Sequence, residues 1–232
     1  PNAAMPPPDR AQARLAAQAL GVDLDDAGAD RLLAYLSLLQ RWNATYNLTA
    51  VRDPAAMWVQ HVLDCLAAVP SVRRHLQQAA PRGARPRILD VGSGGGLPGV
   101  VWAVALPEAD IVCVDTVGKK AAFIRQVAGA LSLANLQARH ARVEQLAEAP
   151  FDLITSRAFA SLVDFTSLTR HALATGGCWL AMKGKPPADE LAALGWPADR
   201  FHVEQLSVPG LDAERCLVWL KPEPGHVGHD ED

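Results

Sequence analysis

The chain has 232 residues, with 22 Lys and Arg, 25 Asp and Glu, a formal net charge of −3 at pH 7 and a hydrophobic fraction of 50%. The apolar fraction excludes a disordered chain, and the length suits one domain with an extension that needs no disulfide or metal for stability. A negative net charge argues at first against a nucleic-acid partner, because such a partner usually requires a basic surface.

The charge is unevenly distributed along the chain. Residues 222–232 hold four acids (Glu223, Asp230, Glu231 and Asp232) and no Lys or Arg, so the rest of the chain is close to neutral. Residues 71–87 and 116–143 each carry five basic residues and no acid. Two interpretations stay open for these stretches: a phosphate-binding face, or a solvated surface whose charges are balanced by acids from elsewhere.

The four cysteines are too widely spaced for a CxxC pair, so we expect neither a metal site nor a disulfide framework (Cys65, Cys113, Cys178 and Cys216). No unbroken apolar run reaches 18 residues, which predicts no membrane span. Residues 1–8 lack the layout of a signal peptide. We expect a cytoplasmic protein, and nothing in the sequence demands more than a monomer.

The first eighty residues predict a disordered, Pro-rich N-terminus over residues 1–8 and a helical cap over residues 9–80. Leucines recur at three-to-four spacing in one helix of the cap (Leu32, Leu33, Leu36 and Leu39). A second helix is predicted to begin at Asp53-Pro54, an N-cap followed by proline at the first helical position, and to end at about Val69.

From residue 87 the pattern changes to short apolar runs alternating with helical segments, which predicts a parallel sheet with helices on both faces. The predicted strands are residues 87–91, 111–115, 151–156 and 178–183, with a weaker candidate at 136–139. Residues 201–208 and 216–221 are joined by a short link and should form an antiparallel pair. We therefore predict a Rossmann-like domain over residues 81–221, followed by a flexible acidic tail over 222–232.

A glycine-rich loop follows the first predicted strand, in the sequence Asp90-Val91-Gly92-Ser93-Gly94-Gly95-Gly96-Leu97-Pro98-Gly99. Gly94-x-Gly96-x-x-Gly99 matches the dinucleotide pattern, whereas Asp90-x-Gly92-x-Gly94 matches the first motif of S-adenosylmethionine-dependent methyltransferases. A carboxylate at Asp90 would repel a pyrophosphate and favour a cationic methionine group. Asp115, which ends the second strand, suits the ribose of either ligand. The methyl donor is favoured, and a dinucleotide stays open.

Several further motifs give the chain a resemblance to a known family. They are Trp42-Asn43-x-x-Tyr46-Asn47-Leu48-Thr49-Ala50-Val51-Arg52-Asp53, His61-x-Leu63-Asp64, Lys119-Lys120-x-x-Phe123-Ile124-Arg125-Gln126-Val127, Arg142-Val143-Glu144, Ser156-Arg157-Ala158-Phe159-Ala160 and Ala181-Met182-Lys183-Gly184. With the glycine loop they span residues 40–221 in order, and the chain resembles the RsmG (GidB) family of bacterial methyltransferases. The resemblance implies a class I, Rossmann-like fold with a seven-stranded sheet. It also implies methyl transfer from S-adenosyl-L-methionine to N7 of a guanine in 16S rRNA, within the loop that helps form the decoding region.

The resemblance also implies the residues that bind the donor. Asp90 and Gly94 belong to its first motif, and Gly92 and Leu97 should line the methionine and ribose region. Asp115 matches the ribose-binding acid, although many relatives have Ser or Glu-Ser where this chain has Asp115-Thr116. The remaining expected contacts are Val143 and Glu144 beside the adenine and Arg157 at the mouth of the site.

Guanine N7 carries a lone pair and no proton, so we expect no catalytic base and no metal. The predicted partner is 16S rRNA or the small ribosomal subunit, and the candidate contacts are Arg52, His61, Lys119, Arg125, Arg157 and Lys183. A structural salt bridge for Arg157, helix packing for His61 and a plain surface position for Lys183 stay open. An NAD-dependent oxidoreductase and a non-enzymatic RNA-binding assembly factor are the alternative functions.

Overall fold

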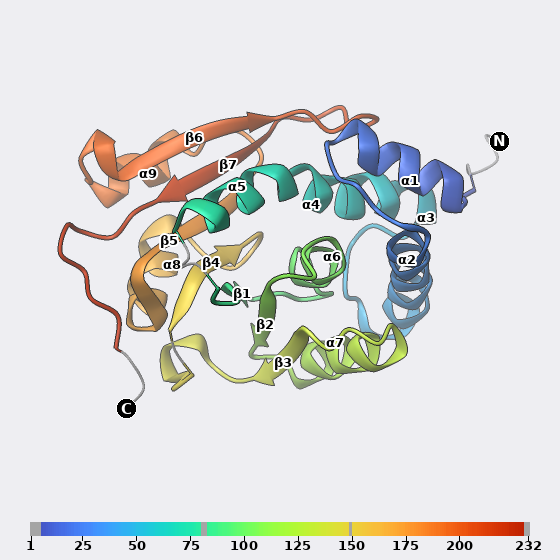
Figure 1. Cartoon of the computed structure of the whole chain (residues 1–232), viewed down its shortest axis with the longest axis horizontal. Coiled ribbons are helices and arrows are strands. Elements are labelled where there is room, and N and C mark those ends of the chain that lie inside the picture. Colours follow the sequence, from blue (N-terminus) through green and yellow to red (C-terminus); the bar gives the residue numbers. More distant parts are fainter. Residues whose placement is uncertain (1–5, 80–82, 149, 230–232) are drawn as a thin grey trace.

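A seven-stranded sheet forms the centre of the computed structural model, which describes residues 6–79, 83–148 and 150–229. The strand order is β3-β2-β1-β4-β5-β7-β6 (Figure 1). β1 to β5 are parallel, whereas β7 is antiparallel to both β5 and β6. The strands are β1 (Arg87–Val91), β2 (Asp110–Asp115), β3 (Leu136–His140), β4 (Phe151–Ser156), β5 (Leu173–Lys183), β6 (Phe201–Leu206) and β7 (Arg215–Leu220). The predicted mostly parallel sheet with an antiparallel last pair is confirmed.

β5 differs most from its prediction, because it begins at Leu173 rather than at residue 178. The added segment contains Gly176, with a φ of 76°, and Gly177. A Cβ on Gly177 would lie 3.0 Å from the carbonyl oxygen of Phe151, so the strands approach too closely for a side chain. Two adjacent glycines are typical of a loop in sequence, and here they instead permit an irregular pairing with β4.

The helices lie on both faces of the sheet. They are α1 (Arg10–Ala19), α2 (Asp26–Tyr46), α3 (Pro54–Met57), α4 (Asp64–Ala67), α5 (Val69–Ala79), α6 (Gly99–Ala105), α7 (Gly118–Ala130), α8 (Leu162–Thr169) and α9 (Ala188–Leu194). A π-helical segment, Trp58–Leu63, joins α3 to α4. The helix start predicted at Asp53 is confirmed, since its carboxylate accepts a hydrogen bond from the Ala56 N–H at 2.9 Å.

The helical stretch Pro54–Ala79 extends ten residues beyond its predicted end at Val69. Its 26 residues are long and apolar enough on average to cross a membrane, although the stretch has no unbroken apolar run of 18 residues. However, 67% of its most apolar window is buried inside the protein. Its apolar side chains pack against the sheet and neighbouring helices, as in the core helix of a globular domain.

The predicted cap is not a separate packing unit. One hydrophobic core contains Leu32 and Leu66 from the cap together with Ile88, Ile111 and Leu180 from the sheet. A second core on the opposite face packs α8 against β1, β2 and β5. Figure 1 shows this division, with α2, α6 and α7 on one side of the sheet and α8 on the other. The sequence boundary at residue 80 therefore separates patterns rather than folding units.

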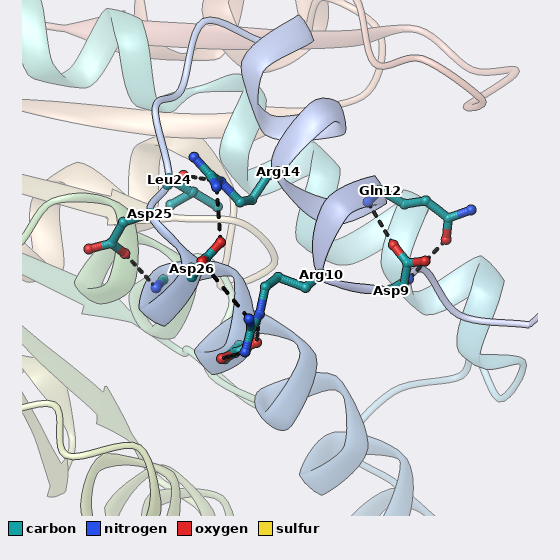
Figure 2. A network of polar contacts seen from close by, with 9 residues as sticks. Asp9, Arg10, Gln12, Arg14, Leu24, Asp25 and Asp26 are labelled. Carbon is teal, nitrogen blue, oxygen red and sulfur yellow. Dashed lines mark hydrogen bonds and ion pairs between the residues drawn. The ribbon is translucent and has the colours of Figure 1, made fainter.

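α1 is attached to the start of α2 by charged side chains (Figure 2). The Arg10 guanidinium donates to Asp30 at 2.7 and 2.8 Å, and Arg14 donates to Asp26 at 2.9 Å. Asp25 caps α2 by accepting from the Gly28 N–H at 2.7 Å. The three acids at the start of α2 therefore all have hydrogen-bond or ion-pair partners within the protein.

The described part of the predicted acidic tail, residues 222–229, contacts the body of the protein. Glu223 forms an ion pair with Arg170. The Gly228 N–H donates to the Thr175 hydroxyl at 2.9 Å, and Gly228 is buried against β5. Residues 1–5 of the predicted disordered N-terminus and residues 230–232 of the tail lie outside the described residues.

Candidate functional site

The glycine loop joins β1 to α6 at the carboxyl edge of the sheet. The Gly92 N–H donates to the Val114 carbonyl at 2.9 Å and so connects the loop to β2. Gly92 and Gly96 have φ values of 65° and 90°, which favour glycine. A Cβ on Gly96 would lie 2.4 Å from a methyl group of Val100, so the tight turn into α6 requires glycine for a second reason.

A pocket of about 200 Å³ opens beside this loop, at the carboxyl ends of β1 and β2. Parallel α/β sheets bind their ligands at this edge. The pocket brings together the predicted donor residues Gly92, Asp115 and Val143. Its lining consists of Val91, Gly92, Val114, Asp115, Thr116, Val117, Lys120, Ala141, Val143, Ala158 and Phe159.

Asp115 supplies the pocket with a carboxylate that backbone groups hold in place. One carboxylate oxygen accepts from the Gly94 N–H at 3.0 Å, and the other accepts from the Val117 N–H at 2.8 Å. Only 8% of the residue is exposed. Because each carboxylate oxygen accepts more than one hydrogen bond, both retain capacity for hydroxyl groups of a ligand.

Asp90 lies beneath the glycine loop rather than in the pocket lining, and it is fully buried. One carboxyl oxygen accepts from the Gly99 N–H at 2.8 Å, at the start of α6. The other has no hydrogen-bond partner in the described part of the chain. Burial raises the pKa of Asp90 to about 8, so the carboxyl is largely neutral at pH 7. Because Asp90 does not line the pocket, the direct contact between this carboxyl and a ligand that the sequence argument assumed is not present.

Other predicted donor residues also lie outside the lining. Leu97 is 9% exposed and packs into the core. Gly94 contributes its N–H to Asp115, as described above. The Glu144 carboxylate lies 3.7 Å from the Arg142 guanidinium on the exposed side of a short 3-10 turn.

The lining also contains residues that were not predicted as donor contacts, and Lys120 and Phe159 have the largest side chains among them. Lys120 follows the predicted Lys119, and Phe159 stands two positions after the predicted Arg157. Both belong to motifs already singled out, so the signal was present but was placed on the neighbouring residue.

Arg157 follows β4 and points into an ion-pair cluster rather than into the pocket. Its guanidinium donates to the Asp64 carboxylate at 3.1 Å, to His61 Nδ1 at 3.0 Å and to the Gln60 carbonyl. Arg215 of β7 donates to the same carboxylate at 2.6 and 2.9 Å. Asp64 is fully buried, so this Asp64 cluster links α4 to the end of β4 and the start of β7.

His61 lies in the π-helical segment, where its ring connects the Asp64 cluster to the loop after α2. Burial, followed by the Arg157 guanidinium, lowers the pKa of His61 to about 4, so the ring is neutral at pH 7. Because Arg157 donates to Nδ1, the ring proton sits on Nε2, which donates to the Thr49 hydroxyl at 2.6 Å. This places His61 in a structural network rather than free beside the pocket.

The remaining RNA candidates differ in their partners. Lys183 pairs with Glu190 at 3.2 Å, and Arg125 donates to the Ala138 carbonyl of β3 at 3.3 Å. Arg52 donates to the Asn47 side chain at 3.1 Å. The Lys119 ammonium lies 5.2 Å above the Tyr46 ring.

The two basic stretches also differ. The described arginines of residues 71–87 all pair with acids: Arg73 with Glu108, Arg74 with Glu204, Arg85 with Asp110 and Arg87 with Glu148. These ion pairs favour the second interpretation of the stretch, a surface whose charges are balanced by acids from elsewhere. In residues 116–143, Arg139 pairs with Glu148 and Arg142 with Glu144, which leaves the cations of α7 without an acidic partner in the described chain.

The chain is similar in sequence to known proteins over most of its length. The family model described as rRNA small subunit methyltransferase G matches residues 29–218. A ribosomal RNA small subunit methyltransferase G from Acidovorax sp. (strain JS42) is 61% identical over 212 residues, covering 90% of this chain and 93% of that protein. The protein of the same name from Leptothrix cholodnii is 61% identical over 215 residues, covering 93% and 96%. A solved rRNA methylase from Streptococcus thermophilus is 15% identical, with a TM-score of 0.48 over 66% of this chain and 95% of that one.

The sheet order, the glycine loop after β1 and the pocket beside Asp115 define a Rossmann-like enzyme of the class I methyltransferase type. The chain belongs to the rRNA small subunit methyltransferase G family. This membership makes a methyl donor the expected cofactor and sets aside the NAD-dependent oxidoreductase. In the described residues, no group of three or more His, Cys, Asp or Glu side chains is arranged to hold a metal, and the four cysteines are free.

Proposed function

We propose that this chain transfers the methyl group of S-adenosyl-L-methionine to N7 of a guanine in 16S rRNA, in the loop that helps form the decoding region. Family membership supports the reaction class and ribosomal RNA as the substrate class. We place the enzyme in the cytoplasm as a monomer acting on this RNA or on the small subunit.

The observation that carries the proposal is the position of Asp115 in the pocket. Its two anchored oxygens suit the vicinal hydroxyl groups of a ribose. Val143 and Phe159 supply apolar surface for an adenine ring, and Gly92 lets the Phe159 side chain pack directly against the loop backbone. These residues fit an adenosine-containing donor, and Asp90 supports them from below by holding the first turn of α6.

The donor supplies a methyl group already activated by a sulfonium centre. Guanine N7 presents its lone pair directly, so the chain has no proton to remove from the attacking atom. The protein then contributes by aligning the two ligands and by excluding water. His61 suits no role as a base, because Arg157 and Thr49 occupy its two ring nitrogens.

The test is transfer of label from S-adenosylmethionine to unmodified small-subunit RNA, with the methylated atom identified by cleavage at N7-methylguanine. We expect label at one guanine, and Asp115→Ala should lose it. Asp110→Ala, on the opposite end of β2, is the matched control and should retain transfer. Absence of label in RNA and in assembled subunits would refute the enzyme and favour the non-enzymatic assembly factor.

A further inference from the structure

Cations without an acidic partner gather on one part of the described chain. Arg31 and Arg41 of α2, Arg52 of the following loop, and Lys119, Lys120 and Arg125 of α7 all lack an ion-pair partner there. Two further cations without such a partner, Lys185 and Lys221, follow β5 and β7 and do not belong to this group. Residues 31–52 contain no Asp or Glu, and neither do residues 116–143. This grouping is the local basic surface that the net charge of −3 conceals.

A cleft of about 440 Å³ opens on α2 beside the loop that follows it. Arg41 and Arg52 both line this cleft and are exposed, with Ser37, Gln40 and Asn43 as further polar groups. Two guanidinium groups and neutral polar side chains, with no acid in the lining, suit the phosphates of a nucleic-acid backbone.

An exposed aromatic side chain, Tyr46, neighbours the cations of α7. Tyr46 ends α2, and 39% of the residue is exposed. Its ring lies 5.3 Å from Trp42, and the Lys119 ammonium lies 5.2 Å from the ring centre. Lys120, the next residue, lines the donor pocket. An exposed aromatic ring beside cations is the arrangement that binds unstacked bases.

The loop after α2 connects this surface to the donor loop. A Cβ on Gly95 would lie 3.7 Å from Cβ of Leu48, and the Gly95 carbonyl accepts from the Tyr35 hydroxyl at 2.6 Å. A strand of RNA lying along Arg52 and Tyr46 would therefore approach the donor pocket from the α2 side.

We propose that Arg41, Tyr46, Arg52 and Lys119 form an RNA-positioning surface, called here the α2–α7 surface, which holds the single-stranded segment next to the target guanine. Arg41 and Arg52 bind backbone phosphates in the cleft, and Tyr46 stacks on an unpaired base. The inference rests on the proposed function and adds the residues that position the substrate, including Arg41 and Tyr46, which no sequence motif assigned to RNA.

The test measures binding of unmodified small-subunit RNA at several salt concentrations, together with the KM and kcat of methyl transfer. The variants are the pair R41Q/R52Q, Tyr46→Ala and Tyr46→Phe. The control is R74Q/R85Q, which removes the same charge from arginines that pair with acids. S-adenosylhomocysteine affinity and the unfolding midpoint are measured for each variant, so that loss of the donor site or of the fold is recognised.

We expect R41Q/R52Q to weaken RNA binding about 10-fold or more, to lower the salt slope by about 2 and to raise KM with little change in kcat. Tyr46→Ala should weaken binding about 10-fold and Tyr46→Phe less than 2-fold, since stacking needs the ring and not the hydroxyl. Equal losses in the control pair, or unchanged RNA binding in the test pair, would overturn the surface. A wild-type protein that binds RNA through this surface but transfers no methyl group would instead refute the proposed function.

Discussion

The carboxyl edge of the sheet has two halves, which differ in whether their charged side chains have ion-pair partners. We call the half beside β1 and β2 the open half and the half beside β4 and β5 the paired half. Beside β1 and β2, Asp115 faces an open pocket and keeps only backbone partners. Beside β4 and β5, Arg157 and Lys183 are each engaged by a carboxylate, Asp64 and Glu190. Charged residues at equivalent strand ends therefore have different roles. In our proposal Asp115 binds a ligand, whereas Arg157 and Lys183 join helices to the sheet.

In the paired half, we expect the largest loss of stability from a substitution in the Asp64 cluster. Asp64→Ala leaves Arg157 and Arg215 largely buried without their shared carboxylate, so the free energy of unfolding should fall by about 3 to 5 kcal/mol. Urea unfolding measures it. Asp110→Ala, which breaks an exposed pair with Arg85, should change stability little. If the two variants were equally stable, the cluster would not hold the layers together.

His61, which contacts the paired half through Arg157, should make the free energy of unfolding fall in acid. Its pKa is about 4 in the folded protein against 6.5 in the unfolded chain, so the unfolded chain binds more protons between these values. Stability from this group is complete above pH 6.5 and falls as the pH drops toward 4, by up to about 3 kcal/mol. His61→Gln should flatten the pH dependence of unfolding in this window. His202→Gln, at an exposed position on β6, should leave it unchanged, and equal slopes in both variants would refute this origin.

In the open half, we expect Asp115 to contribute most to the affinity for the donor. Asp115→Ala removes both side-chain oxygens that would accept from the ribose, so S-adenosylhomocysteine should bind about 10- to 100-fold more weakly in calorimetry. Asp115→Asn should lose less, because one amide oxygen still accepts hydrogen bonds. Wild-type affinity in Asp115→Ala would show that the donor binds elsewhere.

Lys183 gives the smallest expected effect. Its ammonium is 22% exposed and is held by Glu190, so Lys183→Ala should change RNA affinity less than 2-fold and stability by less than about 1 kcal/mol. A large loss of RNA affinity would return Lys183 to the substrate site and erase the contrast between the two halves.

The fold was largely predictable because apolar periodicity and glycine placement are local signals. β1 and β4 have their predicted bounds, and Asp53 caps its helix as expected. The start of β5 was missed, since Gly176 and Gly177 have a loop-like sequence, and their pairing depends on the neighbouring strand.

The site was less predictable, because pairing is decided by residues distant in sequence. Arg157 meets Asp64 across 93 positions, and Asp64 meets Arg215 across 151. A local motif shows that Arg157 ends a strand but not which way its side chain turns. Asp90 was predicted to contact the donor, but it is buried beneath the glycine loop. The sequence shows an acid at this position but not how deeply it is buried.

The most direct test of the central claim is mapping of N7-methylguanine in small-subunit rRNA from cells that carry this protein, lack it, or carry Asp115→Ala. We predict one N7-methylated guanine in the decoding-region loop with the wild-type protein, and an unmodified guanine there in the other two strains. The same methylation in all three strains would contradict it.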